Sequence, residues 1–128
     1  MRVLALDYGS ARCGCALSDP TGTLATPIEP VLRPATKKGF AALTALVRER
    51  EVGRVVVGLP LGLSGADTAQ TRETREFAAR LDAALEVPVD LYDERFTTAI
   101  AQRAGGTIAS EDSRAAAVLL EDWLVRHG

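Results

Sequence analysis

The segment VLALDYGSARCGCALS, residues 3–18, decides the fold of this chain. Its first apolar run ends in Asp7, and Tyr8-Gly9-Ser10 interrupts the pattern before residues 13–18 resume it. Small and polar residues between two apolar runs are typical of a tight turn, so we predict two antiparallel strands. The hairpin then carries an acidic residue at the end of its first strand.

Strands and helices are expected to follow this hairpin. A third strand is predicted at residues 24–32, where two prolines confine it to a sheet edge or break it. Residues 36–51 have helical spacing of apolar side chains after a capping threonine, and residues 54–59 have the pattern of a buried parallel strand. The remaining predicted elements are a helix at 69–85, a strand at 87–92, a short helix ending near 105–106 and a final helix from about 110.

Length and composition favour one domain. The chain has 128 residues, of which 47% are hydrophobic, enough for one well-buried core and hardly for two. We therefore expect a single α/β domain over residues 1–128, with a five-stranded mixed sheet of three antiparallel and two parallel strands flanked by helices. This order of elements resembles the ribonuclease H-like architecture.

Several classes of protein are disfavoured. No apolar run approaches the roughly 18 to 20 residues of a membrane span, and a strand opens the chain in place of a signal peptide, which indicates a cytoplasmic protein. Cys13 and Cys15 would share one face of a strand and could not form a framework disulfide. The single histidine, His127, argues against zinc sites and Ser-His-Asp triads. A net charge of -2 argues mildly against general nucleic-acid binding.

Three acidic residues stand at the ends of predicted elements. Asp7 ends the first strand, Glu94 follows the last strand, and Asp112 lies in the first turn of the final helix. Ligands of such sheets gather near the carboxyl ends of strands, so the three would converge if the first and last strands lie near each other. Clustered carboxylates need a positive charge between them, and Mg²⁺ or Mn²⁺ answers that need.

Each acid also has a purely structural interpretation. Asp7 could close a turn, Glu94 could form a surface ion pair with Arg95, and Asp112 could favour the helix dipole or assist the cap at Ser110. Local sequence leaves these alternatives open.

The first hairpin also suggests a phosphate-binding surface. Gly9, Ser10 and Gly14 would let a phosphate backbone approach closely, with Arg12 near the tip. A similar Asp-x-Gly hairpin opens sugar kinases and actin-like ATPases, although 128 residues would supply only one lobe of such an enzyme.

Four motifs in this order and spacing resemble the YqgF family, also called RuvX, of Holliday junction resolvases and nucleases of the 16S ribosomal RNA precursor. The resemblance covers nearly the whole chain. The motifs are Ala5-Leu6-Asp7-Tyr8-Gly9-Ser10-Ala11-Arg12-Cys13-Gly14 with Ser18-Asp19, Val57-Gly58-Leu59-Pro60-Leu61, Asp93-Glu94-Arg95-Phe96-Thr97-Thr98, and Asp112-Ser113-Arg114-Ala115-Ala116.

The resemblance implies a cytoplasmic bacterial nuclease with a ribonuclease H-like fold. It assigns Asp7, Glu94 and Asp112 as catalytic ligands of Mg²⁺ or Mn²⁺, as two ions. The residues expected to contact nucleic acid are Gly9, Ser10, Arg12, Arg95, Thr98 and Arg114. The implied substrates are structured RNA, above all the 5′ end of the 16S ribosomal RNA precursor, or branched DNA.

Two departures from the family pattern bear on substrate binding. The stretch before the last acid, residues 103–111, contains one basic residue where relatives commonly carry several, and Ala11 stands where a lysine is common. A Holliday junction resolvase would be expected to act as a homodimer, whereas an RNA-processing enzyme could work as a monomer. A degenerate domain that binds nucleic acid without cutting it is the alternative outside enzymes.

Overall fold

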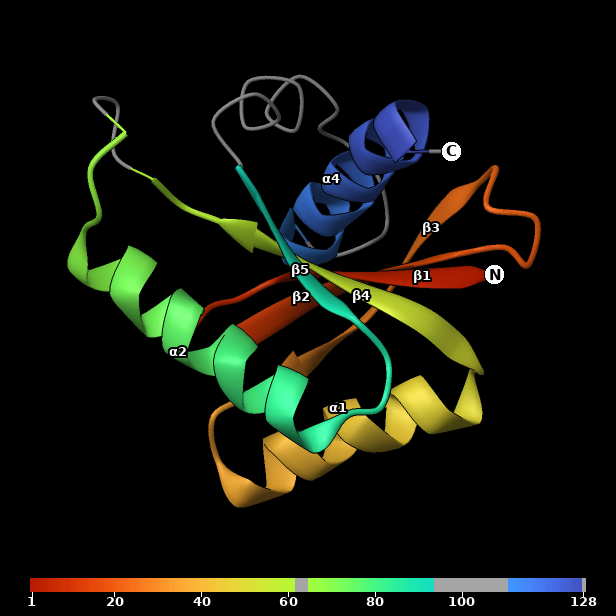
Figure 1. Ribbon diagram of the computed structural model, residues 1–128. Helices are drawn as coiled ribbons and strands as arrows, with labels where there is room; N and C mark the ends of the chain where they lie inside the picture. The colour runs from red at the N-terminus through yellow and green to blue at the C-terminus, as the bar shows by residue number, and fades with distance from the viewer. Residues whose placement is uncertain (62–64, 94–110, 128) are drawn as a thin grey trace.

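A five-stranded mixed sheet forms the centre of the molecule in the computed structural model, which describes residues 1–61, 65–93 and 111–127 (Figure 1). The strands are β1 (Arg2–Asp7), β2 (Arg12–Ser18), β3 (Ala25–Leu32), β4 (Val52–Leu59) and β5 (Val89–Asp93). Their order across the sheet is β3-β2-β1-β4-β5. The first three are antiparallel, and β4 and β5 run parallel to β1, which confirms the predicted mixed sheet.

Among the described residues, three helices cover the two faces of this sheet. They are α1 (Lys37–Glu49), α2 (Ala69–Ala84) and α4 (Glu111–His127). Figure 1 shows α1 and α2 on one face and α4 on the opposite face. The sheet is therefore the middle of three layers, and a side chain on a central strand faces either the α1/α2 layer or α4.

Threonine side chains fix the starts of the first two helices. The Thr36 hydroxyl accepts a hydrogen bond from the backbone N–H of Gly39 at 3.1 Å, and Thr68 forms a capping box with Thr71. Such caps satisfy N–H groups that have no partner inside the helix. The predicted start of the first helix at Thr36 is confirmed.

Strand β1 is buried on both faces because it lies at the centre of the sheet. Leu4 and Leu6 pack into the core beneath α1 and α2, whereas Val3 and Ala5 pack against α4. This alternation follows from the two-residue period of a strand. Asp7 has the same parity as Val3 and Ala5, so it belongs to the α4 face.

The edge strand β3 and the two cysteines also agree with the sequence. The strand pairs only with β2 in the sheet order, as its prolines required. Cys13 and Cys15 are not joined in a disulfide, and both are buried on the α1/α2 face. The short helix predicted to end near residues 105–106 lies outside the described residues. In the part of the chain that is described, no helix is long and apolar enough to cross a membrane.

Candidate active site

Asp7 lies at the carboxyl end of the central strand, at the edge of the sheet where three parallel strands end. Its register partner on β2 is Gly14, and the preceding Leu6 pairs with Val57 of β4. Ligand sites of parallel sheets form at this edge because the loops that leave the strands meet there. We call it the carboxyl edge.

Two glycines flank Asp7 on the face that α4 covers. Gly14 pairs with Asp7 directly, and Gly58 follows Val57, the partner of Leu6, on the other side. Neither has a positive φ, so the backbone conformation does not require glycine at either place. Glycine inside a strand weakens it and often marks a site where a ligand or another backbone comes close. The sheet beside Asp7 thus carries no side chains that would crowd its carboxylate.

Ser113 fixes the start of α4 above the same part of the sheet. Its hydroxyl donates to the backbone carbonyl of Ile28 at 2.6 Å and accepts from the N–H of Cys15 at 3.4 Å. The β2–β3 register shifts between Cys13 and Cys15, a bulge that interrupts the ladder where Ser113 binds. Ser113 is completely buried. Sequence reasoning missed its role, although it stands inside the fourth motif directly after Asp112.

The structure brings the first turn of α4, which contains Asp112, to the carboxyl edge. Ser113 contacts Cys15, whose neighbour Gly14 pairs with Asp7, so the Asp112 backbone lies over the strands around Asp7. The Asp112 side chain, and the whole of Glu94, Arg95 and Thr98, lie outside the described residues.

Strand β5 ends at Asp93, directly before Glu94, but it is not the neighbour of β1. Strand β4 lies between them, so the ends of β1 and β5 are two strand spacings apart, about 10 Å. Between those ends Gly58 supplies no side chain, and it pairs with Tyr92. The carboxyl ends of β1 and β5 therefore lie on the same side of the sheet with one strand between them, and the convergence of Asp7 with Glu94 stays a prediction.

The remaining described candidates lie in the turn after Asp7, at the start of β2 and in α4. Ser10 and Arg12 are exposed in the β1–β2 turn and at the start of β2, while Arg114 is half-buried in α4. A Cβ on Gly9 would lie 2.7 Å from the carbonyl oxygen of Arg12. Gly9 is thus required by the turn itself, whatever else approaches it.

Tyr8 ties the Asp7 end of β1 to α2 and was also missed. Its hydroxyl donates to Oε1 of Glu73 at 3.0 Å, and its ring stacks on Phe77 with centroids 4.3 Å apart. Burial, and then the Glu73 carboxylate, raise the pKa of Tyr8 to about 12. The sequence did contain a signal for this contact. Tyr8 directly follows Asp7, and successive side chains of a strand face opposite sides of the sheet, so Tyr8 is expected on the α1/α2 face.

Asp19, part of the first motif, has a structural role. Its carboxylate accepts hydrogen bonds from the Thr21 hydroxyl and from the N–H groups of Thr23 and Leu24. These hydrogen bonds hold the pKa of Asp19 below its usual range. Asp19 closes the β2–β3 turn. This turn lies at the amino end of β1, and Asp7 lies at the carboxyl end.

The donor set suits a hard divalent cation. Carboxylate oxygens are the ligands that Mg²⁺ and Mn²⁺ prefer, and the neighbours of Asp7 on its two adjacent strands are glycines. Within residues 1–61, 65–93 and 111–127, no three His, Cys, Asp or Glu side chains form a group that could hold a metal ion. The side chains of Glu94 and Asp112 lie outside the described residues. Asp7 is therefore the one predicted ligand whose side chain is described.

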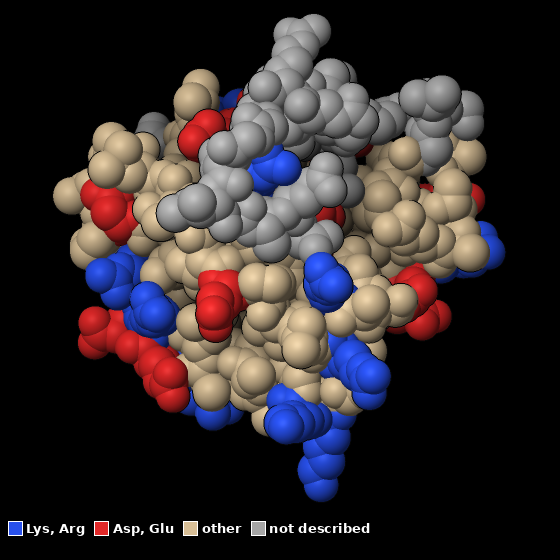
Figure 2. Space-filling model, turned by 180° about the vertical axis from the view of Figure 1, so that it is seen from behind, with Lys and Arg blue, Asp and Glu red and all other residues tan. Residues whose placement is uncertain are grey.

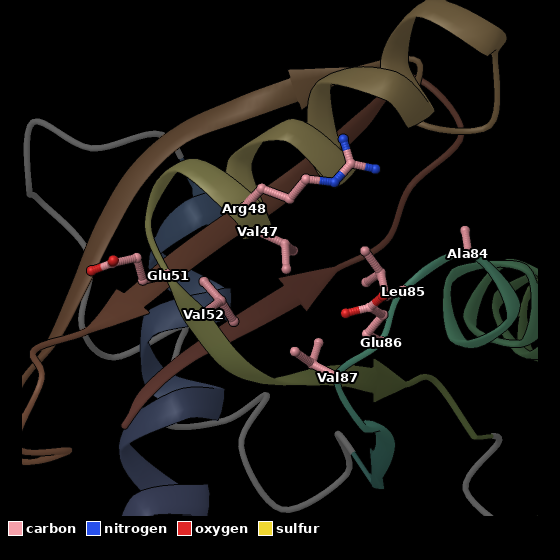
Figure 3. A pocket seen from close by; sticks show the side chains of 8 residues that line it. All are labelled: Val47, Arg48, Glu51, Val52, Ala84, Leu85, Glu86 and Val87. Carbon is pink, nitrogen blue, oxygen red and sulfur yellow. The ribbon is translucent and has the colours of Figure 1, made fainter.

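A groove of about 430 Å³ lies away from this site, at the amino ends of the parallel strands (Figure 3). Its lining comes from the end of α1, the start of β4 and the segment after α2, and includes Val47, Val52 and Val87. The groove therefore cannot contribute to chemistry at Asp7.

Comparison with known proteins places these features in a family. The sequence model of the RuvX family, described as Holliday junction resolvase, matches residues 1–126. A protein of Maridesulfovibrio salexigens named as a pre-16S rRNA nuclease is 37% identical, with 98% of this chain and 99% of that protein covered. A protein of the same name from Anaeromyxobacter dehalogenans strain 2CP-1 is 42% identical, with 98% of each chain covered.

A solved structure supports the fold. RuvC of T. thermophilus, in complex with a Holliday junction substrate, has a TM-score of 0.60 and 16% sequence identity, with 100% of this chain and 96% of that chain covered. The fold is ribonuclease H-like, as the resemblance of the motifs implied.

Proposed function

The chain belongs to the RuvX family of Holliday junction resolvases, and we propose that it is a divalent-metal-dependent nuclease acting on structured nucleic acid. The observation that carries this proposal is the setting of Asp7. Its carboxylate ends the central strand between two glycines, beneath the first turn of α4. The names of the relatives support phosphodiester cleavage as the chemistry.

Asp7, Glu94 and Asp112 would hold Mg²⁺ or Mn²⁺, as two ions. The chemistry that such ions would supply there is activation of a water and neutralisation of the charge that develops on a scissile phosphate. The chain itself supplies the position of Asp7 through β1 and that of Asp112 through the Ser113 anchor. Water is the nucleophile, and the products end in 5′-phosphate and 3′-hydroxyl.

Contacts to the nucleic-acid backbone are assigned to side chains around the acids. Arg12 is exposed two residues before Gly14, the register partner of Asp7, and Arg114 follows Asp112 by two residues in α4. Gly9, Ser10, Arg95 and Thr98 complete the proposed set. Residues 1–128 would act as one domain, since a single sheet holds both described cores.

The 16S ribosomal RNA precursor, at its 5′ end, is the first proposed substrate, because the relatives are named for it. Both this RNA and recombining DNA are found in the bacterial cytoplasm, where the protein would act. The family description favours a second candidate, the Holliday junction. Symmetric cleavage of a junction would call for a homodimer, whereas RNA processing would not.

Cleavage of end-labelled precursor RNA and of four-way DNA junctions tests the proposal. Wild type should cut one of them with Mg²⁺ or Mn²⁺ and not with chelator, and Asp7→Asn should lower the rate at least about 100-fold, because one carboxylate ligand is removed. Asp82→Asn is the matched control, since Asp82 is an exposed acid on α2 away from the carboxyl edge. Its rate should equal that of the wild type.

A second variant tests the setting of Asp7 rather than its charge. Gly58→Val places a branched side chain next to Asp7 on the α4 face, and it should lower cleavage about tenfold while the sheet stays folded. Binding without metal-dependent cutting on either substrate would refute the nuclease and favour a non-catalytic binding module. Full activity of Asp7→Asn would refute the site.

A further inference from the structure

We propose that the corner where β3 leads into α1 is a docking surface for the phosphodiester backbone of the substrate. We call it the basic corner, and its cations are Arg12, Arg33, Lys37 and Lys38. It would guide a nucleic-acid strand across the β2 and β3 ends of the sheet toward Asp7. This inference rests on the proposed nuclease function and adds where the substrate lies.

The basic corner adjoins the candidate active site through the sheet register. Arg12 pairs with Leu32 at the end of β3, and the N–H of Arg33 donates to the carbonyl of Ala11 at 2.9 Å. Because β2 and β3 are the next two strands beyond β1, Arg33 stands about two strand spacings to the side of Asp7. It also lies further along the strand direction, because its partner Ala11 is three residues beyond Gly14, the partner of Asp7. A strand whose scissile phosphate lies at the proposed metal site of Asp7 could therefore continue past Arg12 toward Arg33.

Cations predominate in the sequence of this corner, while Glu73 and Glu76 of α2 line a neighbouring pocket with Ala35. The chain as a whole has a net charge of -2, yet no acidic residue occurs between Glu29 and Glu49. Arg12, Arg33, Lys37 and Lys38 are all exposed. Figure 2 shows several Lys and Arg side chains below the grey atoms on the face seen from behind. A local excess of cations in an acidic protein is what backbone recognition requires.

Two features of the corner disfavour the fold locally. Lys37 and Lys38 occupy the first turn of α1, where the helix dipole favours acidic residues and opposes cations. Arg33 adopts a left-handed backbone conformation with φ of 46°, which is uncommon for a residue with a side chain. The charges of Lys37 and Lys38 therefore do not stabilise the start of α1, and both remain available to an anionic ligand.

Other contacts make the corner rigid. The carbonyl of Arg33 accepts from the Thr36 hydroxyl at 2.7 Å, and a Cβ on Gly39 would collide with that same carbonyl. Arg80 of α2 donates to the carbonyl of Ala35 at 2.7 Å and stacks on Phe40 at 3.8 Å. A rigid surface loses little entropy when it binds. Arg80 is used in this bracing, so it is not counted among the docking cations.

A groove in the corner fits the rest of a nucleotide. It measures about 640 Å³ and lies between the end of β3 and the first turns of α1, with Arg33 and Lys38 on its rim. Val31 and Ala42 form apolar lining, and Leu32 beside them is 65% exposed. Apolar walls with cations at the rim suit a sugar and base whose phosphates lie outside.

Binding measurements in an inactive background test the inference. Asp7→Asn and Asp7→Asn with Lys37→Gln and Lys38→Gln are titrated with a fluorescent four-way DNA junction and a fluorescent RNA hairpin, in Mg²⁺ and at several salt concentrations. The added changes should weaken binding of the preferred nucleic acid roughly tenfold and lower the salt slope by about 0.9 for each duplex phosphate that is no longer neutralised. The probe that binds more tightly shows whether the docked backbone is DNA or RNA.

Arg48→Gln is the matched control, because Arg48 is an exposed cation at the opposite end of the same helix. It should leave the dissociation constant within twofold. Tm separates binding from folding: replacing the two lysines should leave Tm unchanged or raise it, since they oppose the dipole.

An unchanged dissociation constant and salt slope would overturn the basic corner, and so would a wild-type protein that binds neither probe. Corner-dependent binding without any cleavage would instead overturn the nuclease and leave the docking surface standing. The two failures are therefore distinguishable.

Discussion

The two faces of the sheet are built from side chains of different size. Beneath α1 and α2 the core consists mainly of large residues, such as Leu4, Leu43 and Phe77. Under α4 many of the facing residues are small, such as Ala5, Ala16 and Ala116. Small residues let a helix approach the sheet closely, whereas large ones bury more apolar area. The first face therefore contributes more stability, and the second sets the position of α4 over Asp7.

Leu43→Ala should produce the largest loss of stability and test the first half of this comparison. Leu43 is almost fully buried between α1 and the sheet, so truncation should lower the free energy of unfolding by about 2–5 kcal/mol. Urea unfolding measures the loss. Cleavage per folded molecule, measured well below Tm, should stay within twofold. A large fall in that rate would show that the faces are not separate in function.

Ala116→Leu tests the other face. Ala116 is fully buried against the sheet, and the added side chain should cost about 1–3 kcal/mol because α4 must move away. Its first turn then moves relative to Asp7, so cleavage should fall more than tenfold even where the protein is folded. Comparison with Leu43→Ala at matched stability isolates this effect. Equal activity of the two variants would contradict the proposed division of roles.

Ser113→Ala removes the anchor of α4 without changing the helix packing. The carbonyl of Ile28 loses its hydroxyl donor, which should cost about 1–2 kcal/mol. Cleavage should fall severalfold, and raising the Mg²⁺ concentration should restore part of it if Asp112 is a metal ligand that has become less well positioned. Ser18→Ala is the comparison variant, because Ser18 is also a buried serine but lies on β2.

Tyr8 gives the smallest expected effect and the one that depends on pH. Its folded pKa of about 12 exceeds the ordinary value of about 10, so the neutral phenol is favoured in the folded state. The resulting stability is fully present below pH 10 and is lost as the pH rises toward 12. Tyr8→Phe should cost about 1 kcal/mol at pH 8 and make this alkaline loss shallower, as urea unfolding at pH 8, 10 and 11 would show.

Tyr92 has a pKa raised to about 12 by burial and by its hydrogen bond to Asp122, so some alkaline loss should remain in Tyr8→Phe. If the wild type and Tyr8→Phe lost stability identically with rising pH, Tyr8 would not be a cause of the alkaline loss. Because Tyr8 packs on the α1/α2 face beside Asp7, cleavage by Tyr8→Phe should change less than threefold.

Local pattern predicted most of the fold, since strand alternation, proline and threonine caps act over a few residues. Strand β3 was placed at an edge from its prolines, and α1 was started at Thr36 by its cap. The position of Asp7 at the end of β1 was predicted in the same way.

Contacts between distant parts of the chain were not predictable in this way. Nothing near Ser113 indicates that its hydroxyl meets Ile28, which is 85 residues away. The flanking of Asp7 by Gly14 and Gly58 depends on the register of three strands, and local sequence does not state a register. The placement of β4 between β1 and β5 was not predictable either, because it also depends on pairing between distant strands.

The Ser113 anchor has a consequence for how the protein is made. Cys15 and Ser113 are separated by 98 residues, so this contact cannot form until synthesis has passed through α4. The β1–β2–β3 meander can pair early, because its contacts are local, whereas closure of the α4 layer is a long-range event. A nascent chain would therefore present its basic corner before its acids are assembled, and it would gain the ability to bind nucleic acid before the ability to cut it.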